Sequence, residues 1–291
     1  MTIHPHRPSS ALSRTCLLAV LALLLSAPLL QGCREKPAER RTIAVTIEPL
    51  RFFTEHIAGN RFDVFSMVPQ GGNPESYEPS ARQMMSLAHS DLYIMVGSIG
   101  FERTWMKRIE DNARHTVIAN ASEGIVPATS ADGISDPHTW MSTANARIMA
   151  ENICRAITSI DPKDSLYYKA NKERLLTRID SVETEVRRHI TASGKQKAFL
   201  IYHPILTYFA RDYGLRQLPI EQEGREPSAA QMQQVLRKAA EEGVTTFFVQ
   251  QEFDNRSVKA TASELGLQPT PINPLGYDWD KEMTRTARLL K

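Results

Sequence analysis

Short apolar runs alternate with segments of helical periodicity along most of this chain. The predicted strands are residues 42–46, 62–68, 92–96, 115–119, 197–202, 216–219, 245–249 and 268–272. The predicted helices between them are residues 48–57, 81–90, 101–112, 205–213, 229–242 and 257–265. Alternation of this kind is typical of parallel sheets covered by helices, so we expect an α/β fold.

One long segment in the middle of the chain has helical spacing and no helix breaker. Residues 163–191 contain neither Gly nor Pro, and Leu175, Ile179, Val182 and Val186 recur at helical intervals. A helix of this length spans roughly 40 Å, although a coiled-coil segment or two shorter helices would give a similar pattern. We expect an N-terminal α/β lobe over residues 42–162, a linking helix over 163–193 and a C-terminal α/β lobe over 194–291.

The N-terminus has the composition of an export signal. Residues 1–33 carry Arg7 and Arg14 but no acid, and the apolar stretch 16–30 is shorter than a membrane span. Cys33 follows Gly32 and resembles the lipidated cysteine of a bacterial lipoprotein signal; an ordinary cleaved signal with an incidental cysteine is the alternative. We expect residues 34–41 to tether the folded protein, by a lipid anchor, to the periplasmic face of a membrane in the bacterial cell envelope.

Removal of residues 1–33 changes the cysteine count and the charge. Cys154 is then the one remaining cysteine, so no internal disulfide can form, and its helical apolar neighbours indicate a core position. The segment contains two arginines and no acid, so its loss takes the net charge from +2 to about zero. A balanced charge without a basic run argues against a nucleic-acid partner.

Two histidines lie where α/β proteins place their sites. His138 is in the segment Asp136-Pro137-His138-Thr139-Trp140, and His203 follows the apolar run 198–202. Strand ends are common ligand-binding positions, and imidazole is a frequent ligand of transition metals. The spacing alone raises only the hypothesis of a metal site.

Six motifs in order resemble one family. They are Thr-Ile-Glu-Pro at 46–49, Gly-Gly-Asn-Pro-Glu-Ser-Tyr-Glu-Pro-Ser at 71–80, Asp-Pro-His-Thr-Trp-Met-Ser at 136–142, the His203 segment at 203–215, Glu-Pro-Ser at 226–228 and Ile-Asn-Pro-Leu at 272–275. Together they resemble the zinc/manganese solute-binding proteins of ABC importers, from about residue 42 to the C-terminus. The resemblance implies two lobes joined by a rigid helix, and a monomer that passes metal to a permease with its ATPase and performs no catalysis.

The resemblance also implies a set of metal ligands. It assigns them to Glu75, His138, His203 and, at the fourth position, Asn273. Glu75 stands where the family usually has histidine, and it is either a carboxylate ligand or a solvent-facing loop acid. Asn273 stands where the family often has an acid, so it either binds the metal or holds a water. The residues that could compensate for the missing acid are Glu223, Glu252 and Asp278.

The metal and two rival functions remain open at this point. The usual affinity order favours Zn²⁺, while two imidazoles and one carboxylate also suit Mn²⁺ or Fe²⁺. A surface lipoprotein of the same fold, adhesin-like and without metal, would account for the departures at Glu75 and Asn273. A metallohydrolase would use the same histidines, with Glu223 or Glu252 as base. Residues 121–134 contain no histidine, so a His-rich metal-capturing loop is absent there.

Overall fold

The computed structural model describes residues 40–129, 135–192, 194, 197–221, 228–253 and 256–290. Residues 41–291 group into one compact unit. The predicted signal segment with Cys33, nearly all of the predicted tether, and Glu223 lie outside the described residues. No helix in the described part of the chain is both long and apolar enough to cross a membrane.

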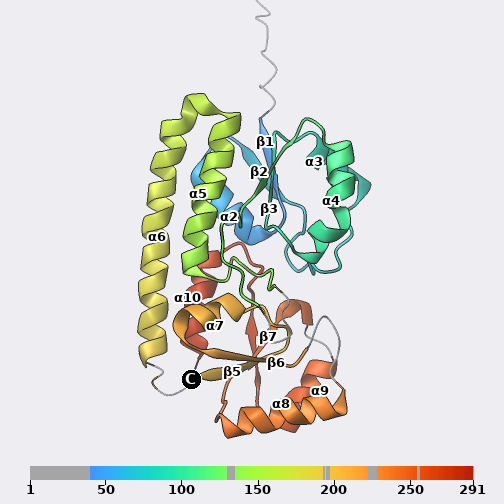
Figure 1. The fold of residues 1–291 in the computed structure, drawn as a ribbon, viewed down its shortest axis with the longest axis vertical. Coiled ribbons are helices and arrows are strands. Elements are labelled where there is room, and N and C mark those ends of the chain that lie inside the picture. Colours follow the sequence, from blue (N-terminus) through green and yellow to red (C-terminus); the bar gives the residue numbers. More distant parts are fainter. Residues whose placement is uncertain are drawn as a thin grey trace, which may run out of the picture. The chain divides into compact units, whose positions relative to one another are not determined.

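Two parallel four-stranded sheets form the framework of the unit (Figure 1). The first has the order β2-β1-β3-β4 and the second the order β6-β5-β7-β8. The strands of the first sheet are β1 Thr42–Val45, β2 Asp63–Ser66, β3 Leu92–Met95 and β4 Val117–Asn120. Those of the second are β5 Ala198–Ile201, β6 Arg216–Pro219, β7 Phe247–Gln250 and β8 Pro269–Ile272.

The strand order of each sheet predicts where a ligand would bind. In both sheets the chain order reverses between two central strands, β1 and β3 in one and β5 and β7 in the other. Open α/β sheets bind ligands beyond the carboxyl ends of such a strand pair. His203 lies two residues after β5, so it stands at the reversal point of the second sheet.

Helices cover both sheets, and one of them joins the two halves of the unit. Between the strands lie α2 Glu48–Ala58, α3 Ala81–Ala88, α4 Gly100–Asn112, α7 Thr207–Tyr213, α8 Ala229–Glu241 and α9 Arg256–Leu265. The joining helix α6 runs unbroken from Ser165 to Ala192, so its 28 residues span about 42 Å. The predicted α/β fold with a long helix between two lobes is confirmed.

Two helices have no bounds among the predicted elements, although the apolar spacing around Cys154 indicated part of the first. α5, Thr143–Ile160, begins at the cap Ser142, and α10, Trp279–Leu289, is the last helix of the described chain. The buried face of α10 consists of Trp279, Met283, Thr286 and Ala287, and the first, second and last of these recur at helical spacing. α10 packs against α6, and the Trp279 ring lies 4.9 Å from the Phe53 ring of the first lobe.

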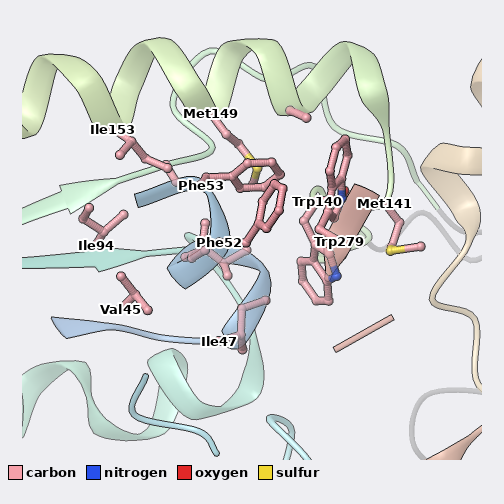
Figure 2. Close-up of a cluster of buried hydrophobic side chains, with 14 of the residues drawn as sticks. Val45, Ile47, Phe52, Phe53, Ile94, Trp140, Met141, Met149, Ile153 and Trp279 are labelled. Carbon is pink, nitrogen blue, oxygen red and sulfur yellow. The ribbon is translucent and has the colours of Figure 1, made fainter. Parts of the chain in front are cut away.

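A single hydrophobic core extends through both lobes. It includes Ile43 and Ile94 from the first sheet and Phe199 and Phe248 from the second, together with one side of α5, α6 and α10. Figure 2 shows Trp140 and Trp279 beside Phe52 and Phe53 within this core. A smaller cluster packs the other face of the second sheet under α8 and α9. Because the core is continuous, the lobes are held together by buried packing as well as by α6.

Candidate metal site

The loop that carries Glu75 is fixed to the start of α4. The side chain of Asn73 accepts a hydrogen bond from the Glu75 backbone N–H at 2.9 Å, and Phe101 N–H donates to the Pro74 carbonyl at 2.7 Å. A Cβ on Gly100 would lie 2.6 Å from the Glu75 carbonyl and from its Oε2. Glycine at position 100 therefore allows the Glu75 loop to pack against the helix.

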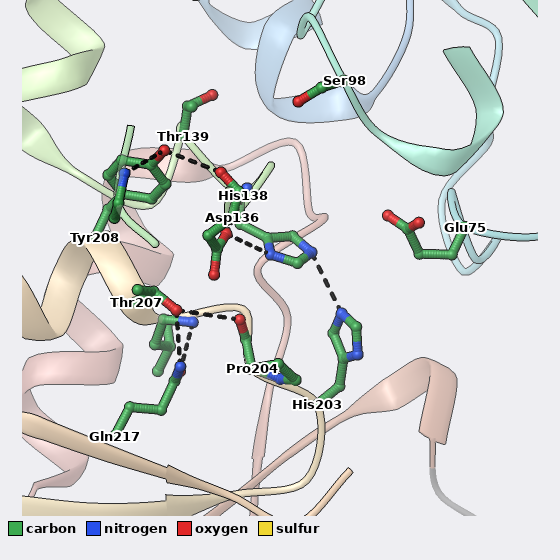
Figure 3. A network of polar contacts seen from close by, with 12 residues as sticks. Glu75, Ser98, Asp136, His138, Thr139, His203, Pro204, Thr207, Tyr208 and Gln217 are labelled. Carbon is green, nitrogen blue, oxygen red and sulfur yellow. Dashed lines mark hydrogen bonds and ion pairs between the residues drawn. The ribbon is translucent and has the colours of Figure 1, made fainter. Parts of the chain in front are cut away.

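The two carboxylate oxygens of Glu75 have different surroundings. Oε2 accepts from Gly100 N–H at 3.1 Å, at the N-terminus of α4, and from Arg103 at 3.2 Å. Oε1 is buried and has no hydrogen-bond partner. Figure 3 shows the side chain pointing from its loop toward the two imidazoles, with no contact drawn between them. Glu75 is thus held by one oxygen, while the other lacks a partner.

His138 is fixed by its own turn. The Asp136 carboxylate accepts from the His138 backbone N–H at 2.7 Å and lies 2.8 Å from its Nδ1. Both side chains are buried, and burial opposes ionisation of Asp136, but His138 and hydrogen bonds from it and from Thr207 outweigh burial and lower the pKa of Asp136. The ionised carboxylate keeps the proton on Nδ1, which directs a bare Nε2 away from the turn.

His203 is fixed through its backbone and the face of its ring. Gln250 Nε2, at the end of β7, donates to the His203 carbonyl at 2.7 Å. The Phe253 ring stacks on the imidazole with centroids 5.1 Å apart and an interplanar angle of 20°. Nδ1 lies 3.3 Å from Glu221 Oε2 without a hydrogen bond. The ring plane is therefore set, while Nδ1 lacks the close partner that His138 has.

The two histidines meet although 65 residues separate them. Their Nε2 atoms lie 3.3 Å apart, and the rings are nearly perpendicular at 87° (Figure 3). A hydrogen bond at this point requires one Nε2 to carry a proton, whereas metal binding requires both to be bare. Among the described residues, no three His, Cys, Asp or Glu side chains are grouped closely enough to hold a metal ion.

Two further acids lie around His203. Glu221 is only 5% exposed, and the motifs of the sequence did not single it out. Glu252 has both carboxylate oxygens buried without a hydrogen-bond partner in another residue; burial raises its pKa, although the nearby His203 favours its ionised form. Glu221 follows β6, the neighbour of β5, so the strand order of an α/β sheet was the signal that could have indicated it.

The candidates for the fourth position differ in their surroundings. Asn273 packs its side chain against Gly276, where an added Cβ would lie 2.8 Å from Nδ2, and its backbone N–H donates to Glu282 at 2.7 Å. Asp278 is exposed and pairs with Lys281 at 3.0 Å. Of these two residues and Glu252, Glu252 alone has a buried carboxylate without a hydrogen-bond partner. The assignment of Asn273 as a ligand remains a prediction.

Hydrogen bonds across the lobes hold the two histidine segments in place. Trp140 Nε1 donates to the Pro274 carbonyl at 2.8 Å, and Trp279 Nε1 donates to the Trp140 carbonyl at 2.7 Å. The Tyr208 hydroxyl, on α7, donates to the Asp136 carbonyl at 2.9 Å. The turn that carries His138 is therefore bound directly to the lobe that carries His203.

Comparison with known proteins gives consistent results. The chain matches the model of the family described as zinc-uptake complex component A, periplasmic, over residues 43–287. The high-affinity zinc uptake system protein ZnuA of Bacillus subtilis is 25% identical over 263 residues, which cover 84% of this chain and 82% of that protein. The manganese ABC transporter substrate-binding lipoprotein PsaA of Streptococcus pneumoniae is 24% identical over 269 residues, which cover 85% and 86% of the two chains.

A crystal structure of ZnuA has the same fold. It matches with a TM-score of 0.81 and 31% sequence identity, and the match covers 86% of this chain and 97% of that one. The family model spans well over half of the sequence, which confirms the resemblance drawn from the six motifs. The chain belongs to the family of zinc-uptake complex component A, periplasmic.

Proposed function

We propose that this protein captures a divalent transition metal ion, Zn²⁺ in the first place, with Glu75, His138 and His203. The observation that carries the proposal is the 3.3 Å separation of the two Nε2 atoms. Two nitrogens bound to one tetrahedral zinc at 2.0–2.1 Å are roughly 3.3–3.4 Å apart. An ion on the open side of the pair would thus find two of its ligands already at the required spacing.

Glu75 is the proposed third ligand. Its Oε1 is buried without a partner, and its side chain points toward the imidazoles. Because Oε2 is held by Gly100 and Arg103, the carboxylate must turn or the loop must shift for Oε1 to reach the ion. The positive ion then replaces a hydrogen bond between two histidines, and a water or Asn273 completes the coordination.

The charge around the pair favours a cation. Asp136 and Glu221 are buried beside the Nδ1 atoms of the two histidines, and Glu252 is close enough to interact with His203 electrostatically. These acids offset the +1 charge that would remain after the Glu75 carboxylate alone faced a divalent ion. Zinc is favoured over Mn²⁺ and Fe²⁺ because sites with imidazole ligands follow the usual affinity order. The family description and the zinc-uptake relative support the same choice.

Delivery to a membrane permease and its ATPase is the proposed next step. It rests on the family, whose relatives include a zinc uptake protein and a manganese ABC transporter lipoprotein. Lipidation at Cys33, the tether over residues 34–41 and a periplasmic, membrane-anchored monomer belong to the same proposal. So do the division into lobes 42–162 and 194–291 and the absence of catalysis.

Metal capture is proposed to occur without wide opening of the lobes. A large hinge motion would break the continuous core and the hydrogen bonds that Trp140 donates to Pro274 and Trp279 donates to Trp140. Binding is therefore expected to rearrange loops around the site and to tilt the lobes only slightly. Small-angle scattering of the metal-free and the zinc-loaded protein tests this, and a large compaction on loading would contradict it.

Metal competition tests capture itself. The purified full-length protein is stripped with chelator and offered equal Zn²⁺, Mn²⁺ and Fe²⁺, and the retained metal is counted by mass spectrometry. We expect one equivalent of zinc, lost in His138→Ala and in His203→Ala. His89→Ala is the matched control, because His89 is exposed and, among the described residues, its ring contacts the Met85 carbonyl of α3.

The other outcomes of the competition experiment have definite meanings. Retention of manganese or iron would keep the solute-binding function and change the cargo. Retention of no metal would favour the surface lipoprotein without metal. Zinc uptake by cells that carry the permease and ATPase then tests delivery, and it should fail with His138→Ala and succeed with His89→Ala.

A further inference from the structure

His203 lacks the close carboxylate partner that His138 has, yet a carboxylate lies on the corresponding side of its ring. Glu221 Oε2 is 3.3 Å from His203 Nδ1, and the two side chains are 7% and 12% exposed. Neither atom has a hydrogen-bond partner in the described structure. A buried acceptor and a buried ring nitrogen that face each other without a bond are an exception that calls for an explanation.

The sheet fixes the position of Glu221. Strand β6 pairs with β5 in parallel, and the pairing continues past both strands, because Ile220 N–H donates to Ile201 O and Glu221 N–H to Tyr202 O, each at 2.9 Å. Glu221 is thus bonded to the residue that immediately precedes His203. Its carboxylate is placed by strand register rather than by a loop conformation.

Other contacts of His203 fix the plane of its ring but do not determine which ring nitrogen carries the proton. Phe253 stacks on one face, and Gln250 binds the carbonyl. Among the described residues, Glu221 is the acid that lies within ion-pair distance of His203 Nδ1. On the other histidine, Asp136 occupies this same position at 2.8 Å. A carboxylate on Nδ1 keeps the proton there and leaves the Nε2 lone pair for a metal ion.

We infer that Glu221 is the positioning residue of His203, which accepts the Nδ1–H hydrogen bond when Nε2 binds the metal. The inference rests on the proposed function, because it assigns a partner to one of the proposed ligands. In the structure the pair is a few tenths of an ångström beyond a normal hydrogen bond. A small rotation of the ring on loading closes that gap and brings His203 into the arrangement that His138 already has.

Variants at position 221 test the role by affinity and by spectrum. We expect Glu221→Ala to weaken zinc binding about 10–100-fold in chelator competition, the usual effect of losing such a partner. Glu221→Gln keeps an acceptor oxygen, so its loss should be smaller than that of Glu221→Ala. Both should alter the visible absorption of bound Co²⁺, which reports the ligand field. Glu242→Gln is the matched control. Glu242, at the end of α8, pairs at 2.8 Å with Arg216, which begins β6, outside the site.

The wild-type protein provides a second test that does not depend on how the variants fold. In the ¹⁵N–¹H spectrum of the zinc-loaded protein, His203 should carry its proton on Nδ1 and the metal on Nε2. The inference is overturned if the metal is on Nδ1, or if folded Glu221 variants bind zinc with wild-type affinity and an unchanged Co²⁺ spectrum. A wild-type protein that binds no metal would instead overturn the proposed function.

Discussion

The two histidines of the site are held in different ways. His138 is 4% exposed, and Asp136 binds both its backbone N–H and its Nδ1 within one turn. His203 is held by a stacked ring and a backbone hydrogen bond, and its acid partner Glu221 comes from a neighbouring strand. The His138 half of the site is built from residues two positions apart. The His203 half depends on the pairing of two strands.

If both histidines bind metal as proposed, the difference separates a preorganised ligand from an adjustable one. The Asp136–His138 turn is complete without metal, so binding there costs little rearrangement. The His203 half still has unpaired polar atoms on Glu221 and Glu252, which a cation would stabilise. In the proposed function, the Asp136–His138 half would fix where the ion sits, and the His203 half would complete its contacts on loading.

The largest expected effect is the loss of either imidazole. His138→Ala and His203→Ala should each weaken zinc binding by more than the roughly 10–100-fold that follows loss of an outer hydrogen-bond partner. His138→Ala should also destabilise the metal-free protein more than His203→Ala, because it leaves the buried Asp136 carboxylate without its histidine. Chelator competition and thermal unfolding measure the two effects, and equal stability of the two variants would contradict the comparison.

A smaller effect is expected where the third ligand is supported. Gly100→Ala would place a Cβ 2.6 Å from both the carbonyl and Oε2 of Glu75, so the loop must move away from α4. We expect zinc affinity to fall about tenfold, at the lower end of the range for a lost support. Isothermal titration compares this variant with the wild type, and unchanged affinity would show that the Glu75 loop is not part of the site.

The joint between the halves should depend on pH. Glu183 on α6 accepts hydrogen bonds from Thr143, from Tyr213 at 3.0 Å and from Arg187 at 2.5 Å. Burial opposes its ionisation, but these bonds outweigh burial and lower the pKa of Glu183 below 4.5. Its stabilisation is therefore present above about pH 4.5 and is lost as the pH falls through the lower folded-state pKa.

Glu183→Gln tests that dependence. The variant should lose about 1–2 kcal/mol of stability at neutral pH, less than the ~1.5–3 kcal/mol of a hydrogen bond to a charged group, because Gln keeps one acceptor oxygen. The difference from the wild type should shrink in urea unfolding as the pH falls below 4.5. A difference that stays constant down to pH 3 would show that Glu183 does not link the helices in this way.

The smallest effect is expected at the fourth position. Asn273 packs against Gly276, and its backbone, not its side chain, makes the hydrogen bond to Glu282. If water completes the coordination, Asn273→Ala should change zinc affinity less than about threefold, below 1 kcal/mol. A tenfold loss of zinc affinity would indicate that Asn273 binds the metal directly, beside the two histidines.

Local patterns in the sequence predicted much of the fold and the histidine pair. Most strands and helices could be located because apolar runs and helix caps are short-range signals, and α6 because it has neither Gly nor Pro. His138 was predicted from its motif, and its partner Asp136 lies two residues away. These features need only neighbouring residues to be recognised.

Other features depend on contacts that single segments do not encode. Glu221 acts on His203 only because β6 lies beside β5, and Glu75 is held only because its loop meets the start of α4. The apolar residues of α10 have helical spacing in the sequence, but its packing on α6 and near Phe53 is a tertiary property. Predicting them requires the strand order and the packing of distant segments.

X-ray absorption at the zinc edge tests the central claim most directly, because it reports the atoms bound to the ion. For the loaded protein we expect two imidazole nitrogens at about 2.0–2.1 Å together with oxygen ligands. In His203→Ala the signature of one imidazole should disappear, and in Glu75→Ala both should remain. A loaded wild-type protein whose spectrum contains no imidazole scattering would contradict the account.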